Sequence, residues 1–180
     1  MTAEQILTNV DASLQKREKA AEILASSEDL RRQSLSFIEN RTDLSLNGLM
    51  VFEILGRMDF NLITPFISTL VQIAHHFTDS SSRRYLAKIF SFAISADKEN
   101  VSQFHLSPTT KLKIIELSFL WLISEEKTAG KVFSMQNIYD LKDEESWIEI
   151  ELKAILEKDL PGSSAGYKSR GSKILRKLRQ

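Results

Sequence analysis

The sequence predicts an all-α fold whose helices stack in pairs, one pair after another, along a solenoid. Only 6 of its 180 residues are glycine and 3 are proline, too few for the many tight turns of a β-sandwich or barrel. Apolar residues recur at steps of three and four along most of the chain, which is the period of an α-helix. Similar helix openings also recur at wide spacings, as in proteins built from stacked helical repeats.

The recurring openings lie at three places. Residues 127–130 (KTAG) and 163–166 (SSAG) are 36 residues apart, and residues 81–84 (SSRR) precede both. Residues 89–92 (IFSF) are similar to residues 132–135 (VFSM), 43 residues later. Helical repeats have periods of about 34 to 47 residues, so we interpret these segments as the starts of equivalent helices that meet the core alike.

Two helices are predicted in the first 43 residues. Residues 3–25 carry apolar side chains at steps of three and four, with Arg17 on the same stripe, so we expect one continuous helix there. Ser26 and Asp29 form a weak capping box. The second helix is expected over about 28–40.

The next pair of helices has clearer start signals. Residues 42 and 43 can cap a helix over about 44–57, which is apolar almost all round and is expected to be buried. Thr64 followed by Pro65 begins a helix over about 65–77, because threonine is a good N-cap and proline at the first helical position gives up only an unpaired N–H.

The third pair is separated by the longest predicted loop. A polar cluster before residue 82 caps a helix over about 81–95, and residues 96–106 are expected to be a loop. Ser107 and Pro108 repeat the N-cap and proline device and begin a helix over 108–123. That helix is apolar on several faces, which places it in the middle of the core.

Three helices complete the chain, over about 126–141, 145–159 and 163–179. Pro161 and Gly162 end the middle one. In the last helix Gly171 lies on the apolar stripe, although glycine weakens a helix by about 1 kcal/mol relative to alanine. We therefore expect it to permit close approach to the preceding helix.

The helices pair naturally along the chain from residue 44 onward. The expected pairs are 44–57 with 65–77, 81–95 with 108–123, and 126–141 with 145–159, while the helix at 163–179 opens a pair that nothing closes. The first members begin 37, 46 and 36 residues apart, within or close to the range of known helical repeats. We expect one domain over 1–180, in which residues 1–43 lie outside the repeat.

This pattern resembles the HEAT and armadillo families of helical repeats. The resemblance rests on residues 61–77 followed by 80–92, and on 128–161 followed by 163–178. Prolines near the start of second helices and basic residues early in first helices add to it; these are Pro65, Pro108, Arg84 and Lys168. The resemblance implies a right-handed α-solenoid, or α-α superhelix, of about nine to ten helices that binds partners and performs no chemistry.

Composition limits the classes of function. The formal net charge is zero, which counts against electrostatic binding of nucleic acid or membrane through the charge of the protein as a whole. The chain has no cysteine, so disulfides, thiolate metal ligands and a cysteine nucleophile are excluded. We find no signal peptide or membrane-spanning segment, no cofactor motif and no catalytic set, and we expect a cytoplasmic protein. Trp121 and Trp147 lie in apolar helical patterns and are expected in the core.

A basic run near the C-terminus is the one candidate binding site. Residues 161–180 contain six lysines and arginines and no acid, whereas the preceding helix is acidic. The candidates for contact with an anionic partner are Lys168, Lys173, Arg176, Lys177 and Arg179. A solvated helix face, or pairing with the acidic helix beside it, would also explain these cations.

Two further constellations are interpreted as structural. His75, His76 and Asp79 have a metal-like spacing, but a zinc site needs three or four converging ligands, and a polar helix end explains them as well. Residues 162–169 (GSSAGYKS) share Gly162, the two serines and Lys168 with the flexible loop of the fumarase superfamily, which includes adenylosuccinate lyase. The other elements of that motif are absent, so we interpret the match as an accident of a capped helix start.

Three hypotheses for function remain from the sequence. The first is a non-enzymatic helical-repeat module that binds a protein partner on a surface lined by successive helices. The second is a nucleic-acid-binding HEAT-like protein of the DNA-alkylation-repair type, using the basic C-terminal helix. The third, a lyase, depends on the partial motif alone.

Overall fold

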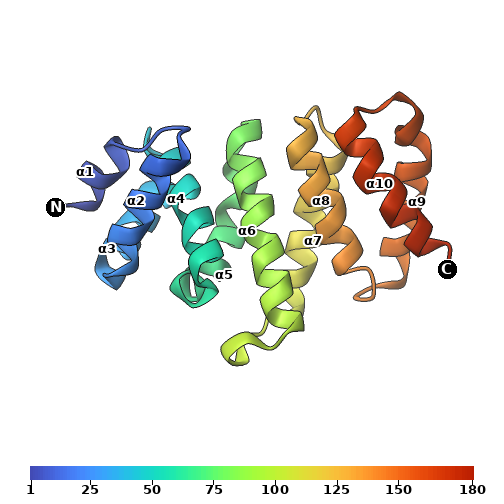
Figure 1. Cartoon of the computed structure of the whole chain (residues 1–180). Helices are drawn as coiled ribbons and strands as arrows, with labels where there is room; N and C mark the ends of the chain where they lie inside the picture. The colour runs from blue at the N-terminus through green and yellow to red at the C-terminus, as the bar shows by residue number, and fades with distance from the viewer.

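The computed structural model describes residues 1–180 and confirms an all-α fold, with ten α-helices, short 3-10 turns and no strand. The helices are α1 (Ala3–Thr8), α2 (Leu14–Ala25), α3 (Glu28–Glu39), α4 (Ser45–Met58), α5 (Ile67–Ile73), α6 (Ser80–Lys98), α7 (Pro108–Ile123), α8 (Thr128–Asp140), α9 (Ser146–Asp159) and α10 (Ala165–Leu178). They follow one another across the molecule, so that the two termini lie at opposite ends (Figure 1).

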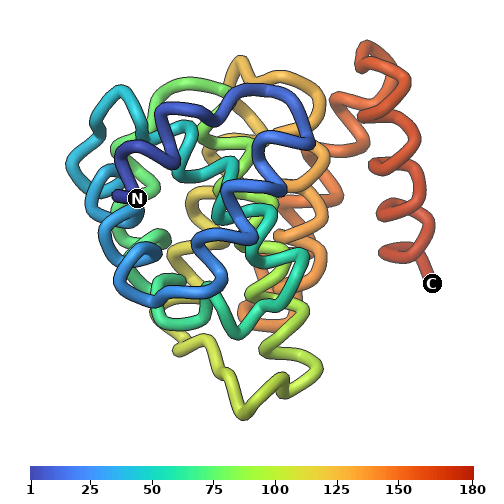
Figure 2. The backbone as a smooth tube through the Cα atoms, turned by 60° about the vertical axis from the view of Figure 1, so that its left-hand side comes forward, coloured from blue at the N-terminus to red at the C-terminus, as the bar shows by residue number.

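The chain alternates between two rows of helices. In the first row, which we call the even row, α2, α4, α6, α8 and α10 each pack extensively against the next. The odd row holds α1, α3, α5, α7 and α9, and its members touch one another less. The turned view of Figure 2 shows the C-terminal segment standing to one side of the other helices. Because each of its helices packs extensively against the next, the even row is the continuous one.

One hydrophobic cluster joins the helices of both rows. It contains 43 buried residues and extends from Ile6 in α1 to Leu175 in α10. Trp121 of α7 is buried in it, as predicted, and its ring stacks on Phe90 of α6 with centroids 6.0 Å apart. The burial of α4 on nearly all sides also agrees with its apolar sequence.

The expected continuous helix over 3–25 is wrong, because the chain breaks between α1 and α2. The Asn9 side chain donates to the carbonyl oxygen of Gln5, and the Asp11 carboxylate accepts from the N–H of Ser13. Such local bonds offer the backbone an alternative to the helix. α1 itself begins with a capping box formed by Thr2 and Gln5, which the sequence analysis missed.

Two other boundaries differ from the prediction. The helix expected over 65–77 is α-helical only from Ile67 to Ile73, with a 3-10 turn on each side. The Thr64 hydroxyl caps no helix and donates instead to the carbonyl oxygen of Phe60. The loop expected over 96–106 is shorter, because α6 continues to Lys98 and a 3-10 turn follows. The start of α7 at Ser107 and Pro108 is confirmed.

The helix contacts also change the expected pairing. α7 packs mainly against α8 and touches α6 only slightly, less than it touches α5, so the pair expected between 81–95 and 108–123 is the smallest of its interfaces. α10 packs against both α8 and α9. Both partners precede α10 in the chain, one in each row, so α10 is the last helix of the stack.

Three helices of the even row share a burial pattern, in a different register from the one that the sequence predicts. The N-caps of α6, α8 and α10 are Asp79, Lys127 and Ser164. In each helix the residues 3, 7, 10 and 11 positions after the cap are buried: Ser82, Leu86, Ile89 and Phe90; Gly130, Ser134, Asn137 and Ile138; Tyr167, Gly171, Ile174 and Leu175. Ile89 thus corresponds to Asn137.

The similarity between residues 89–92 and 132–135 is therefore not a structural equivalence. Ile89 and Phe90 are buried, whereas Val132 and Phe133 are only partly covered. The openings of α8 and α10 do meet in space, because the hydroxyl oxygens of Thr128 and Ser164 lie 2.9 Å apart.

Candidate binding surfaces

The predicted basic residues all lie on α10, or just beyond it, and all are exposed. The helix forms here because the Ser164 hydroxyl accepts from the N–H of Tyr167 and because an apolar stripe packs inward. Gly171 lies on that stripe. A Cβ built on it would lie 2.9 Å from Cδ2 of Leu160, so the close approach predicted at this glycine is confirmed.

The five candidates do not converge on one site. Lys177 lies over the Tyr139 ring of α8, with Nζ 5.4 Å from the centroid. Arg179 instead pairs with Glu157 of α9 at 2.9 Å. Lys168, Lys173 and Arg176 are spread over the exposed side between those two edges. Arg170, which was not a candidate, bonds Gln136 of α8 at 2.8 Å.

Positive charge is concentrated on the even row as a whole. The helices of that row contain fourteen lysines and arginines against five acidic residues, whereas those of the odd row contain six against nine. The segments between helices supply the remaining acids. The zero net charge therefore conceals an uneven distribution.

A cleft in the even row collects several of these cations. It has a volume of about 370 Å³, and we call it the even-row cleft. Its lining comes from the α1–α2 connection and from α2, α4, α6 and α8: Ala12, Arg17, Glu53, Arg84, Tyr85, Lys88, Ala129 and Phe133. Four helices far apart in the sequence therefore build it.

Glu53 is the buried charge of the even-row cleft. Only 1% of its surface is exposed. Its Oε1 lies 2.6 Å from Nζ of Lys88 on α6 and 3.0 Å from Nε of Arg57 on its own helix. Because a buried carboxylate is costly without a partner, both cations compensate its burial, and the pair with Lys88 connects α4 to α6 at this point.

Two arginines meet at the ring of Tyr85. A guanidinium nitrogen of Arg17 donates to the Tyr85 hydroxyl at 3.3 Å, and the guanidinium carbon of Arg84 lies 4.6 Å from the ring centroid. Lys88 completes the cationic wall, with Nζ 5.9 Å from the Phe133 centroid. None of these residues was a candidate from the sequence. The sequence feature that could have indicated them is a charged residue within an apolar pattern. Arg17 lies on the apolar stripe of α2, and Glu53 lies within the apolar sequence of α4.

The odd row exposes an apolar patch on α7 and α9. Leu120, Ile123, Trp147 and Ile150 are 47%, 63%, 44% and 67% exposed. Trp147 packs against the partly covered Phe119 with ring centroids 5.6 Å apart, which joins the two helices. The prediction that Trp147 lies in the core is wrong, because the residue is among the exposed large hydrophobic ones. We call these five residues the α7–α9 patch.

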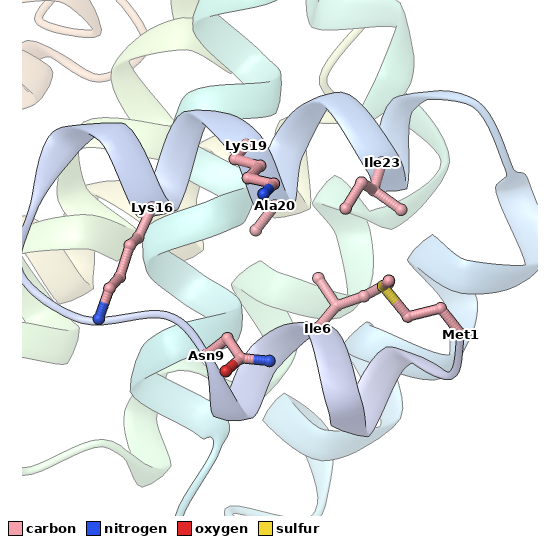
Figure 3. Close-up of a pocket in the computed structure, with 7 residues that line it drawn as sticks. All are labelled: Met1, Ile6, Asn9, Lys16, Lys19, Ala20 and Ile23. Carbon is pink, nitrogen blue, oxygen red and sulfur yellow. The ribbon is translucent and has the colours of Figure 1, made fainter.

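A further hollow of about 310 Å³ lies between α1 and α2, at the break in the predicted helix (Figure 3). It is lined by Met1, Ile6, Asn9, Lys16, Lys19, Ala20 and Ile23. Met1, Ile6 and Ile23 gather at one end, and Lys16 lies at the other. The lining offers two ammonium groups and one amide, and no carboxylate or imidazole for acid–base work.

The histidine pair has ordinary structural partners. The rings of His75 and His76 lie 3.7 Å apart, and Nδ1 of His75 is 2.8 Å from the carbonyl oxygen of Gln72. Asp79 is committed to the N-cap of α6, where its carboxylate accepts from the N–H of Ser82. Loss of solvation, together with the charges of His75 and Arg41, lowers the pKa of His76. No three metal-ligating side chains converge anywhere in the structure.

The segment that resembles the lyase loop serves as a helix boundary. The Ser163 hydroxyl donates to the carbonyl oxygen of Asp159 at the end of α9, and Ser164 caps α10. Gly162 belongs to the 3-10 turn between them. Both hydroxyls are therefore used by the backbone, as a capped helix start requires.

Comparison with protein-family models, with curated proteins and with solved structures finds no match to this chain. None of the ten helices is both long enough and apolar enough to cross a membrane.

Proposed function

We propose that the protein is a non-enzymatic helical-repeat module that binds a protein partner. The α7–α9 patch carries this proposal, because contiguous exposed apolar side chains with an aromatic anchor are characteristic of protein–protein interfaces. Trp147 and Ile150 are the most suitable anchors, since both project from α9 while remaining largely uncovered.

We further propose that the repeat is of the HEAT type and forms a right-handed solenoid. Three observations support it: the alternation between two rows, the shared burial pattern of α6, α8 and α10, and N-caps 48 and 37 residues apart. We also propose that the protein works in the cytoplasm, as expected from the sequence.

The test compares capture of partners by matched variants. Ile150→Glu and Ile123→Glu place a charge in the α7–α9 patch, and Met58→Glu places one at an equally exposed apolar residue elsewhere, 49% exposed on α4. A protein captured in stoichiometric amount by the wild type and by Met58→Glu, but lost from both patch variants, is the expected result. If all four forms capture the same proteins, the patch is not the interface.

Binding of nucleic acid is the second candidate, and the excess of cations on the even row favours it. Such binding would weaken steeply with salt, because each phosphate contact releases counterions. Retention on heparin or single-stranded DNA with a steep salt dependence, undiminished by Ile150→Glu, would support it over the protein partner. Turnover of adenylosuccinate would overturn both proposals and restore the lyase hypothesis.

A further inference from the structure

We propose that the even-row cleft binds an acidic segment of the partner protein, with one carboxylate of that segment held between Arg17 and Arg84. The proposal depends on the function proposed above in one respect, that the partner is a protein. It adds a second contact surface, on the row opposite the α7–α9 patch, and gives the chemistry of the group recognised there.

The charges of the cleft are not balanced from within. Glu53 is the only acidic residue in the lining, and its ion pairs are with Lys88 and Arg57. Arg17 donates to the Tyr85 hydroxyl and Arg84 lies over the Tyr85 ring, and neither guanidinium group is paired with a carboxylate. Two like charges at one tyrosine repel each other, and an anion bound between them would relieve that repulsion.

Guanidinium groups also fit the proposed ligand. They present paired N–H donors in a fixed plane that matches a carboxylate, and they are more weakly hydrated than ammonium groups. The Tyr85 hydroxyl and the backbone oxygen of Ser13 hold the Arg17 side chain in place. The Arg17 side chain is therefore ordered before the ligand binds, which reduces the entropic cost of binding.

The shape and lining favour a peptide over a nucleic acid. A volume of about 370 Å³ is at the small end of ligand clefts, and Ala12, Ala129 and Phe133 provide apolar walls for the aliphatic part of a side chain. Lys88 lies over the Phe133 ring and so covers the face on which a base would stack.

The experiment measures binding of a fluorescein-labelled peptide of eight glutamates to the full chain by fluorescence anisotropy. We expect Arg17→Gln and Arg84→Gln each to weaken binding about tenfold, the usual worth of a charge-assisted bidentate contact. The matched controls Lys173→Gln and Arg176→Gln remove the same charge from α10 and should change affinity less than twofold. Circular dichroism confirms that each variant is folded.

A second variant separates the cleft from a general effect of charge. Glu53→Gln removes the competing carboxylate and frees Lys88, so binding of the peptide should tighten about threefold or more. Equal weakening by the cleft and α10 variants, or no tightening by Glu53→Gln, would overturn the proposal. So would absence of binding to the wild type.

A labelled single-stranded oligonucleotide provides the remaining comparison. If it binds more tightly than the peptide and loses affinity in Arg17→Gln, the cleft recognises nucleic acid and the proposal is wrong. The peptide assay contains no partner protein. Its failure would therefore leave the capture experiment on the α7–α9 patch, and the proposed function, unaffected.

Discussion

One buried carboxylate organises a large part of the even row. Glu53 interrupts the apolar sequence of α4 and contacts cations from two helices. Burial of an ion pair contributes little net stability, whereas removal of one partner is costly. A charge in such a place is better understood as fixing the position of Lys88 than as strengthening the fold.

Asp97 is a partly buried carboxylate whose pKa depends on its neighbours. Burial acts to raise its pKa, but the N–H of Leu106 and the ammonium group of Lys111, 3.0 Å away, outweigh it and hold the pKa of Asp97 below its usual value. The stabilisation is therefore present above about pH 4 and is lost as the pH falls through the lowered pKa. We predict that Asp97→Asn costs about 2 kcal/mol at pH 7.

Urea unfolding at pH 7 and at pH 3 checks this prediction. The wild type should lose more stability over that interval than Asp97→Asn, which has no carboxylate to protonate. Glu99→Gln alters an exposed neighbouring carboxylate and is the control. An unchanged pH dependence in Asp97→Asn would contradict the assignment.

Position 171 requires a glycine because α10 packs closely there against the end of α9. A Cβ there would lie 2.9 Å from Leu160 and 3.4 Å from Leu156, whereas Gly162 has nothing within 4 Å. Gly171→Leu should therefore lower the free energy of unfolding by about 2 kcal/mol through overpacking. Gly162→Leu should change it by less than about 0.5 kcal/mol. Similar values for the two variants in thermal unfolding would show that α10 does not pack closely.

At the scale of elements, periodicity predicted the type and place of most helices. The helices at Glu28–Glu39, Pro108–Ile123 and Ser146–Asp159 begin and end within about a residue of expectation. The prediction from periodicity failed where side chains compete with the helix for backbone groups, as those of Asn9 and Asp11 do. Apolar spacing cannot detect such bonds, because they depend on the local conformation and not on which residues are buried.

The caps of the three equivalent helices should differ in their contribution. Asp79 and Ser164 each accept a backbone N–H, whereas Lys127 at the start of α8 makes no such bond. We predict that Asp79→Ala and Ser164→Ala each cost about 1 kcal/mol, and that Lys127→Ala changes stability by a few tenths. Chemical denaturation measures all three, and an equal cost for Lys127→Ala would contradict the difference between the caps.

At the scale of the whole molecule, the binding surfaces were largely beyond the sequence. Arg17 meets Tyr85 across 68 residues of chain, and only the packing of α2, α4 and α6 brings them together. The α10 cations were visible as a run, yet the helix distributes them around its exposed side. A run of charged residues shows where charge is abundant in the sequence. A binding site, in contrast, depends on which helices become neighbours when the chain folds.

The stacked arrangement predicts a gradient of local stability. α6 and α8 have packed neighbours on both sides, whereas α1 and α10 lie at the ends and contact few helices. Helices whose contacts are limited to one side open more readily. Hydrogen exchange should therefore be slowest in α6 and α8 and fastest in α1 and α10. Uniform protection from end to end would show that the chain unfolds as a single cooperative unit.

The division of charge between the two rows gives this neutral chain a permanent electric dipole. Its isoelectric point is near 6.9, so around neutral pH no net repulsion keeps copies apart. The cationic row of one molecule can then attract the acidic row of another. Such attraction is long-ranged at 0.01 M salt, where the Debye length is about 30 Å, and is screened at 0.15 M, where it is about 8 Å. The protein should accordingly salt in: its solubility near pH 7 should rise as salt is first added.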